Sequence, residues 1–198
     1  MNAYLPDQIP TTKEYAMATT TSELDGTYEL DQTHSTVQFA VRHVGVSTFR
    51  ASFGSIDAHL VIDHGTPELQ AAADVESISI GDPPELREHV VRGGDFFAAD
   101  EHPSISFRST RIRLADDGTA TVAGDLEIRG ISRAVSAAGT FTPPTEDPSG
   151  GVRIGLQLDA TLDRRTWGMD WQMPLPSGGD ALGWDVDVSA RLELTKRT

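Results

Sequence analysis

The chain contains no cysteine, which excludes thiol nucleophiles, thiolate metal sites and disulfide bonds together. Basic residues are few, because 16 Lys and Arg stand against 30 Asp and Glu, for a formal net charge of −14. This balance disfavours nucleic acid as a partner and repels anionic membrane surfaces. No stretch approaches the roughly 20 apolar residues of a transmembrane helix. We therefore expect no nucleic-acid partner and no stable membrane insertion.

The N-terminal segment lacks periodicity and predicts a flexible extension over residues 1–25, followed by a single domain over residues 26–197. Only one basic residue, Lys13, precedes residue 26, and no continuous apolar run of a secretory signal is present. We therefore expect a cytoplasmic protein. Met17 is an alternative initiator to Met1, which the mass of the native protein would decide.

Eight or so segments alternate apolar and polar residues with a period of two, and almost no helix separates them. The clearest cover residues 37–41, 122–128, 154–162 and 186–194. Strict alternation gives each strand one apolar and one solvated face. Even spacing, with turns rich in Gly, Asp and Pro, predicts an all-β sandwich or barrel around one apolar interior.

Two of these segments change phase midway. Apolar residues stand at odd positions as far as Val75 and at even positions from Ile78, and Phe107 gives way in the same manner to Ile112. A β-bulge explains such a switch, because one extra residue moves the following side chains to the other face. The alternative is that half of each strand packs under a neighbouring loop.

One helix signal interrupts the strands. Asp82 is a candidate N-cap, a proline follows at the first helical position, and Glu85 stands at the third. The pair Gly93-Gly94 would end the helix.

The histidines show no H-x-H, H-x-x-x-H or H-E-x-x-H spacing, and no Walker loop or G-x-S-x-G elbow is present. Asp31, His34 and Ser35 could bring an acid, a base and a hydroxyl together, although such residues more often make turn hydrogen bonds. We expect no catalytic residue, no metal and no cofactor. The alternative is a lipid isomerase or hydrolase that uses His34, His43 or His89.

Residues 166–175 have the most unusual composition, with two of the three tryptophans and two of the four methionines. Trp and Met supply large, adaptable apolar contact area suited to an apolar ligand. The same residues would serve equally as ordinary core at the end of a barrel. Trp184 opens the final strand and could face that end.

Six segments, in order, resemble the YceI-like family of lipocalin-like, polyisoprenoid-binding proteins. They are YELDQTHSTVQFAVRH (28–43), LREH (86–89), DFF (95–97), HPSISF (102–107), GDLEIRGISR (124–133) and DRRTWGM (163–169). The likeness extends over about residues 26–194. The chain departs from the family at Trp167, where Phe is common, at Val90, where Leu is usual, and in lacking the export signal of many relatives.

The resemblance implies an eight-stranded antiparallel lipocalin-like barrel with one or two short helices. It also implies a long-chain isoprenoid or fatty-acyl-type lipid in the interior, for carriage, storage or sequestration. The expected ligand-binding residues are Phe39, Val41, His43, Phe53, Phe97, Phe107, Leu126, Ile128, Leu156, Leu158, Trp167, Met169, Trp171 and Trp184.

A polar head group should lie at a mouth of the barrel, because burying it unpaired costs several kcal/mol. Its candidate partners are Arg87 and His89 on the short helix and Arg164 beside the Trp/Met segment. A further alternative is a ligand-free, stress-related interaction protein whose barrel is filled by its own side chains. A homodimer is a possible assembly.

Overall fold

The computed structural model describes residues 24–197. The predicted extension, apart from its last two residues, and the alternative initiator Met17 lie outside the described residues.

The chain folds into ten β-segments, one α-helix and two short 3₁₀-helices. The α-helix, α1, covers Pro84–Arg92, and the 3₁₀-helices η2 and η3 cover Val75–Ser77 and Arg164–Trp167. The β-segments are β1 (Gly26–Leu30), β2 (Thr36–His43), β3 (Ser47–Phe53), β4 (Ile56–Asp63), β5 (Thr66–Asp74), β6 (Ser104–Leu114), β7 (Thr119–Ile128), β8 (Ile131–Glu146), β9 (Val152–Asp163) and β10 (Leu182–Lys196).

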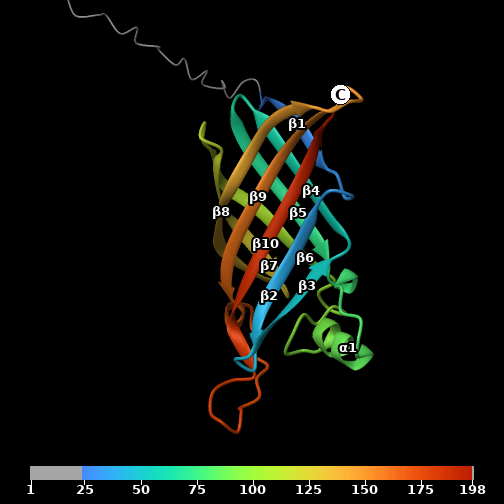
Figure 1. Cartoon of the computed structure of the whole chain (residues 1–198), viewed down its shortest axis with the longest axis vertical. Helices are drawn as coiled ribbons and strands as arrows, with labels where there is room; N and C mark the ends of the chain where they lie inside the picture. The colour runs from blue at the N-terminus through green and yellow to red at the C-terminus, as the bar shows by residue number, and fades with distance from the viewer. Residues whose placement is uncertain (1–23, 198) are drawn as a thin grey trace, which may run out of the picture.

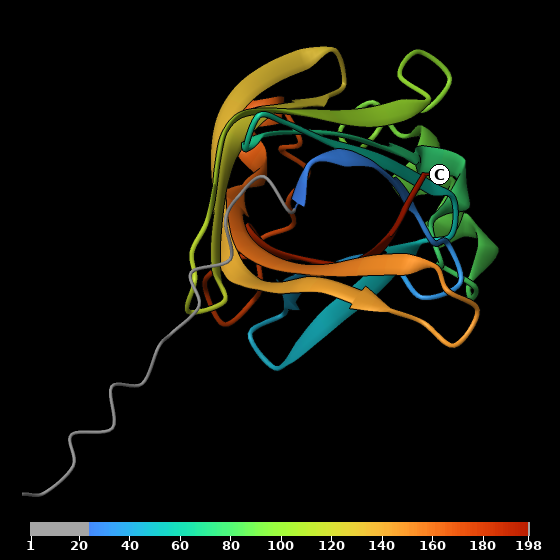
Figure 2. The same ribbon diagram turned by 90° about the horizontal axis from the view of Figure 1, so that it is seen from above.

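The ten segments make eight long antiparallel strands. β1 and β2 follow one another along a single strand, and β3 and β4 form its partner, because β2 pairs with β3 while β1 pairs with β4. β5 to β10 continue as antiparallel neighbours. β10 then pairs with both β1 and β2, which closes the sheet into a barrel (Figures 1 and 2). The prediction of an eight-stranded antiparallel barrel is confirmed.

Apolar side chains fill the barrel in two clusters, one towards each end. We call the cluster at the β1 end, uppermost in Figure 1, the upper core. The cluster at the α1 end is the lower core. The upper core consists of Leu24, Tyr28, Ala58, Leu60, Ile62, Leu69, Ala120, Val122, Phe141, Ile154, Leu156, Leu158, Leu192 and Leu194. The lower core consists of Ala51, Phe53, Ile56, Ala73, Val75, Ile78, Ile80, Val90, Val91, Phe97, Ala99, Ile128, Trp167 and Met169.

The two predicted phase changes have different structural causes. In β6 the register against β7 shifts between Ser109 and Arg111, so the predicted bulge is confirmed there. After β5, the change is made by η2, whose N-cap Asp74 accepts a hydrogen bond from the Glu76 amide at 2.9 Å. A 3₁₀ turn, not a bulge, therefore resets the side-chain phase at that point.

The predicted helix is present but is capped one residue later than expected. Pro83 occupies the N-cap position in place of Asp82, Pro84 is the first helical residue, and Gly93 is the C-cap. Within residues 24–197, no helix is long and apolar enough to span a membrane.

Candidate functional site

A cavity of about 170 Å³ lies inside the barrel between the upper and lower cores. Every strand segment except β3 contributes to its wall, and the side chains that face it are apolar. Asp57, Ala72 and Ser106 also border the cavity, but they are exposed on the outer face and so meet it through their main chain. The inward side chains are Leu30, Val37, Ile56, Ala58, Leu69, Ala71, Ala73, Ile105, Phe107, Val122, Leu126, Val135, Ala137, Leu158, Ala160, Leu162, Val188, Ala190 and Leu192.

Small residues create this space. Ala137, Ala160 and Ala190 stand on three consecutive strands and face the cavity. Gly124 has a different effect, because a Cβ built there would lie 2.6 Å from Cζ of Phe107. Because Gly124 has no Cβ, the ring of Phe107 can pack against the main chain there and form part of the cavity wall.

Different kinds of structure lie at the two ends of the cavity. Every member of the upper core except Leu24 belongs to a strand, so the main-chain ladder holds it in place. Most of the lower core comes from outside the barrel strands, including Val91 of α1, Phe97 of the following loop and Trp167 of η3. Segments outside a sheet ladder open at a lower free-energy cost. The lower end is therefore the end at which the cavity can be opened.

The cavity is smaller than a long hydrocarbon chain requires. An apolar cavity of about 150 Å³ accommodates a molecule the size of benzene. In this conformation the cavity of about 170 Å³ is too small for the long-chain lipid that the resemblance led us to expect in the interior.

The expected ligand-binding residues are distributed over several parts of the molecule. Phe107, Leu126 and Leu158 line the cavity. Leu156 belongs to the upper core, and Val41 is buried outside both clusters. Five residues belong to the lower core and a sixth, Phe39, packs against it; the five are Phe53, Phe97, Ile128, Trp167 and Met169.

The three remaining expected residues lie outside the lumen. His43 is exposed at the end of β2, because the strand ends there beside its turn to β3. Trp171 is half-buried against Phe96, with ring centroids 5.7 Å apart. Trp184 is also half-buried, and its indole donates to Asp180 Oδ2 at 3.0 Å.

Arg164 does not act as a free cation at the mouth of the barrel, contrary to the head-group prediction. It is only 3% exposed, and it donates to the main-chain carbonyls of Met169 at 2.6 Å, Trp171 at 2.9 Å and Gly183 at 2.9 Å. Burial lowers the pKa of its guanidinium from the ordinary value. Because its donors are directed to carbonyls, Arg164 fastens the loop after η3 to the start of β10.

The other two head-group candidates stand on the outer side of α1. Arg87 donates to the carbonyl of Glu76 and, at 3.1 Å, to the carboxylate of the same residue. His89 lies 3.2 Å from Asp95 and contacts the ring of Phe96 edge-on. Neither residue borders the cavity.

The segment with an acid, a base and a hydroxyl forms a turn and an ion-pair network. Asp31 accepts from the Thr33 amide at 2.9 Å and from Nη1 of Arg153 at 2.6 Å. Chiefly because of Arg153, the pKa of Asp31 is held far below its ordinary value. Ser35 Oγ bonds the main chain of Glu193, accepting from its amide at 2.9 Å. The hydroxyl is therefore held on main chain and not beside the His34 imidazole.

The same network contains a grouping that sequence reasoning missed. The ligand atoms of Asp31, His34 and Glu193 lie within 4.8 Å of one another, a spacing that suits a metal ion. Nη1 of Arg153, however, lies 2.6 Å from both carboxylates. The guanidinium supplies the positive charge that a cation would bring. The signal was weak because Glu193 reaches Asp31 and His34 only through the pairing of β1 with β10, far along the chain.

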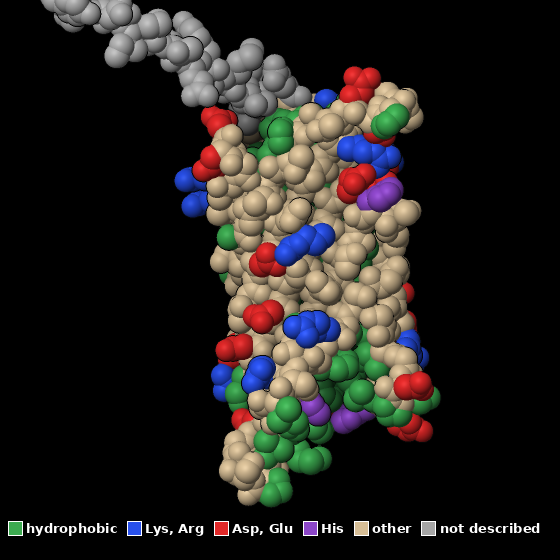
Figure 3. All heavy atoms as spheres, viewed as in Figure 1, with side chains coloured by type: hydrophobic (Ala, Val, Ile, Leu, Met, Phe, Trp, Pro, Cys, Tyr) green, Lys and Arg blue, Asp and Glu red, His purple; other side chains and the backbone are tan. Residues whose placement is uncertain are grey.

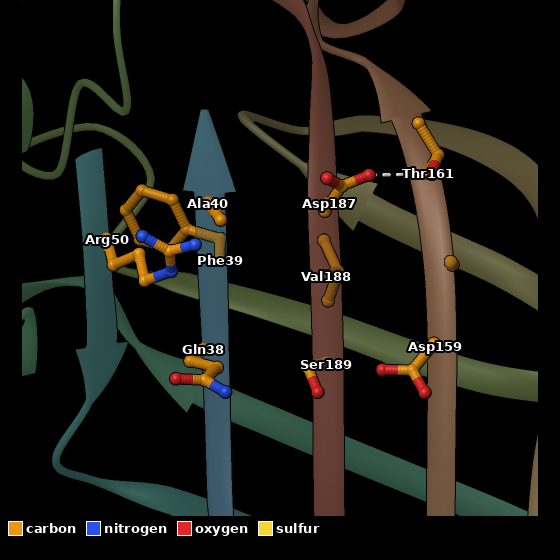
Figure 4. A pocket seen from close by; sticks show the side chains of 10 residues that line it. Gln38, Phe39, Ala40, Arg50, Asp159, Thr161, Asp187, Val188 and Ser189 are labelled. Atoms are coloured by element: carbon orange, nitrogen blue, oxygen red, sulfur yellow. Dashed lines mark hydrogen bonds between the residues drawn. The ribbon is translucent and has the colours of Figure 1, made fainter. Parts of the chain in front are cut away.

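A larger hollow of about 420 Å³ lies on the outer wall, over β2, β3, β9 and β10 (Figure 4). It exists because small residues, Ala40 and Ser189, stand among longer polar ones. Asp187 accepts from Thr161 Oγ1 at 2.8 Å, and Asp159 pairs with Arg191 outside the hollow. The hollow is lined by a mixture of polar and apolar residues on the outer wall, whereas the side chains that face the cavity inside the barrel are apolar, so that cavity is the better candidate site.

Comparison with known proteins gives a consistent result. A family model described as the YceI-like domain matches residues 28–194. A UPF0312 protein of Staphylococcus aureus strain USA300 is 29% identical over 170 residues, which is 85% of this chain and 96% of that protein.

Solved structures share the fold. BcnA of Burkholderia cenocepacia superposes with a TM-score of 0.67 at 20% identity, covering 83% of this chain and 98% of that one. A polyisoprenoid binding domain from Saccharophagus degradans gives a TM-score of 0.61 at 15% identity, with coverages of 86% and 98%. Identities this low support the barrel architecture alone.

Proposed function

Because the chain belongs to the YceI-like family, we propose that its lumen binds a long apolar lipid of the isoprenoid or fatty-acyl type, for carriage, storage or sequestration and without catalysis. The observation that supports this most strongly is the cavity inside the barrel, whose inward side chains are all apolar. A protein of the same fold is named as a polyisoprenoid binding domain, which favours the same class of ligand.

The energetics of burial fit such a ligand. Transfer of a twenty-carbon chain from water contributes on the order of 16 kcal/mol at ~0.8 kcal/mol per carbon. Ordering and association reduce the net gain to about 6 kcal/mol, at roughly 0.3 kcal/mol per heavy atom, which corresponds to a Kd of tens of micromolar. No charged contact is needed, in agreement with a lumen lined by apolar side chains.

The lumen has to enlarge to hold such a chain, and the lower core is where this happens. Met169 lies in this cluster, and its unbranched thioether side chain adapts readily to a changed neighbourhood. Phe97 belongs to the loop after α1 and not to the ladder. Displacement of these side chains joins the cavity to the lower end while the eight strands stay paired.

A pair of identical substitutions on opposite faces of the wall tests the proposal. Ala190 faces the cavity from β10, whereas Ala40 stands on the outer face of the neighbouring β2. Ala190→Phe should weaken binding of a fluorescent prenyl or acyl probe by about tenfold or more, since the ring occupies the chain's path. Ala40→Phe should leave the affinity within about twofold. Equal affinity of both variants and the wild type would remove the lumen as the binding site.

A substitution that adds less volume controls for misfolding of the Ala190→Phe variant. Ala137→Leu on β8 adds less volume to the same cavity and should reduce affinity in the same direction. Thermal unfolding of all three variants shows whether the barrel is intact, and filling a cavity should preserve or raise the midpoint.

A further inference from the structure

Exposed apolar side chains are concentrated at the lower end of the barrel. Among the described residues, four large hydrophobic side chains are exposed: Val46 (83%), Met173 (56%), Val61 (41%) and Leu86 (37%). Val46 lies in the β2–β3 turn, Met173 in the loop after η3, and Leu86 on α1, all at the lower end (Figure 1). In Figure 3, hydrophobic side chains gather at this end, whereas charged ones are spread over the wall.

Two segments at this end, the β2–β3 turn with the first residues of β3 and the middle of the loop after η3, contain no charged side chain. Residues 44–49 (VGVSTF) and residues 171–179 (WQMPLPSGG) contain no Asp, Glu, Lys or Arg, although charged residues make up 23% of the chain. The first of these segments is tied to the chain just beyond the second, because the Val44 amide donates to the carbonyl of Ala181 at 2.7 Å. We call residues 44–49 and 171–179 the apolar tip.

From these observations we propose that the apolar tip docks onto the surface of a lipid bilayer made of uncharged or zwitterionic lipids. The inference rests on the proposed function, because a bilayer can supply and take up the long apolar ligand that the lumen is proposed to bind. Residues 171–179 of the loop after η3 have no charged side chain of their own and can enter the interfacial region without desolvating an ion. Beside the β2–β3 turn, Arg42 donates to the Gly45 carbonyl at 2.6 Å, and its long side chain can keep the guanidinium at the polar surface. Trp171, beside Phe96, is of the residue type that prefers the membrane–water interface. The shape also suits a bilayer, since the loop after η3 extends beyond the end of the barrel (Figure 1).

The tip is connected to the part of the lumen that has to open. Arg164 donates to the carbonyls of Met169, in the lower core, and Trp171, at the root of the tip. Trp171 in turn packs against Phe96, next to the lower-core residue Phe97. Burial of the tip in a bilayer therefore acts on the segments that close the cavity, and the ligand can pass between membrane and lumen at that end.

The overall charge sets the lipid preference. The remainder of a chain with a formal charge of −14 is repelled by an anionic surface. We therefore expect binding to phosphatidylcholine vesicles to fall when part of the lipid is replaced by phosphatidylglycerol. This is the reverse of the behaviour of proteins that dock through basic patches.

Vesicle flotation of the full chain tests the proposal. The wild type should float with phosphatidylcholine vesicles. The double variant Val46→Asp/Met173→Asp should have a partition coefficient at least about tenfold lower than that of the wild type. Val61→Asp is the matched control, because Val61 is an exposed valine on β4 beside β1, at the opposite end. It should float like the wild type. Failure of the wild type to float, or equal loss in the control, would overturn the proposal.

A second measurement separates this inference from the proposed function. A short-chain prenyl or acyl probe, soluble as a monomer, reaches the lumen without vesicles. The double variant should bind this probe with unchanged affinity while it loses flotation. If the wild type binds the probe but does not float, docking is wrong and the lipid-binding lumen stands. If it floats but does not bind the probe, the lumen proposal fails on its own.

Discussion

The guanidinium of Arg164 lies over the indole ring of Trp184, with Cζ 4.3 Å from the ring centroid. Both residues were expected to contact a ligand, yet they contact each other. The stacking leaves the in-plane N–H groups of Arg164 free to donate to main-chain carbonyls, as observed. This pair joins η3, the loop that follows it and the first residues of β10 into one unit.

Removal of the buried guanidinium should therefore destabilise the fold. Arg164→Met leaves several carbonyls without donors, and we expect the free energy of unfolding in urea to fall by about 3 kcal/mol. Arg164→Lys should recover only part of the loss, since an ammonium cannot reproduce the planar set of donors. The neighbouring Arg165, half-exposed and paired with Asp163, is the control. Arg165→Met should cost less than about 1 kcal/mol, and a similar loss in both variants would contradict this role for Arg164.

The wall of the cavity depends on a glycine. A Cβ at Gly124 would lie 2.3 Å from the carbonyl oxygen of Arg108 and 2.6 Å from Cζ of Phe107. Gly124→Ala should lower the free energy of unfolding by about 1–3 kcal/mol, because the strand or the ring has to shift. At Gly94 a Cβ meets nothing within 4 Å. Gly94→Ala should therefore leave the free energy of unfolding nearly unchanged. If both substitutions change this free energy equally in chemical denaturation, the close approach of Phe107 to Gly124 is unimportant for stability.

Stability should fall in acid through the network around Arg153. This guanidinium holds the pKa of Asp31 below its ordinary value, and it adds to the effect of Ser149 in lowering the pKa of Asp147. A carboxyl group with a lowered pKa in the folded state contributes stability that is complete above its unfolded pKa of about 4 and is lost as the pH falls below it. The free energy of unfolding should therefore decline from about pH 5 towards pH 2.

Arg153→Met should make this decline shallower, because the two carboxyl groups then titrate closer to their unfolded values. Urea unfolding measured across that pH range checks the slope. Arg133, whose side chain bonds only a main-chain carbonyl, provides a control whose substitution should leave the slope intact. A wild-type slope in Arg153→Met would show that other groups govern acid stability.

Hydrogen exchange should distinguish the two ends of the lumen. The upper core stands on paired strands, whereas the lower core includes Val90 and Val91 of a nine-residue helix. Amides of α1 should exchange faster than those of β9 and β10. When a lipid probe is added, the exchange rates of amides at the lower end should change most. Uniform protection, with no change on binding, would contradict opening at the lower end.

The sequence predicted the barrel because alternation reports directly which side chains face inward. It located the bulge of β6 and the helix α1 for similar local reasons. It did not distinguish a cavity from a continuous channel, since that depends on how Phe97, Trp167 and Met169 pack from outside the ladder. The head-group prediction for Arg164 was made because an arginine beside an aromatic segment gives the same sequence pattern whether its guanidinium contacts a ligand or main-chain carbonyls. The Asp31–Arg153–Glu193 network was invisible for lack of a local spacing.

The most direct test of the lipid-binding lumen is native mass spectrometry of the full chain, purified gently and without detergent. We expect a population heavier than the polypeptide by the mass of an apolar lipid, which is extractable into organic solvent and is reduced in Ala190→Phe but not in Ala40→Phe. A protein that stays at the polypeptide mass, even after incubation with prenyl and acyl lipids, would contradict the account and favour a barrel filled by its own side chains.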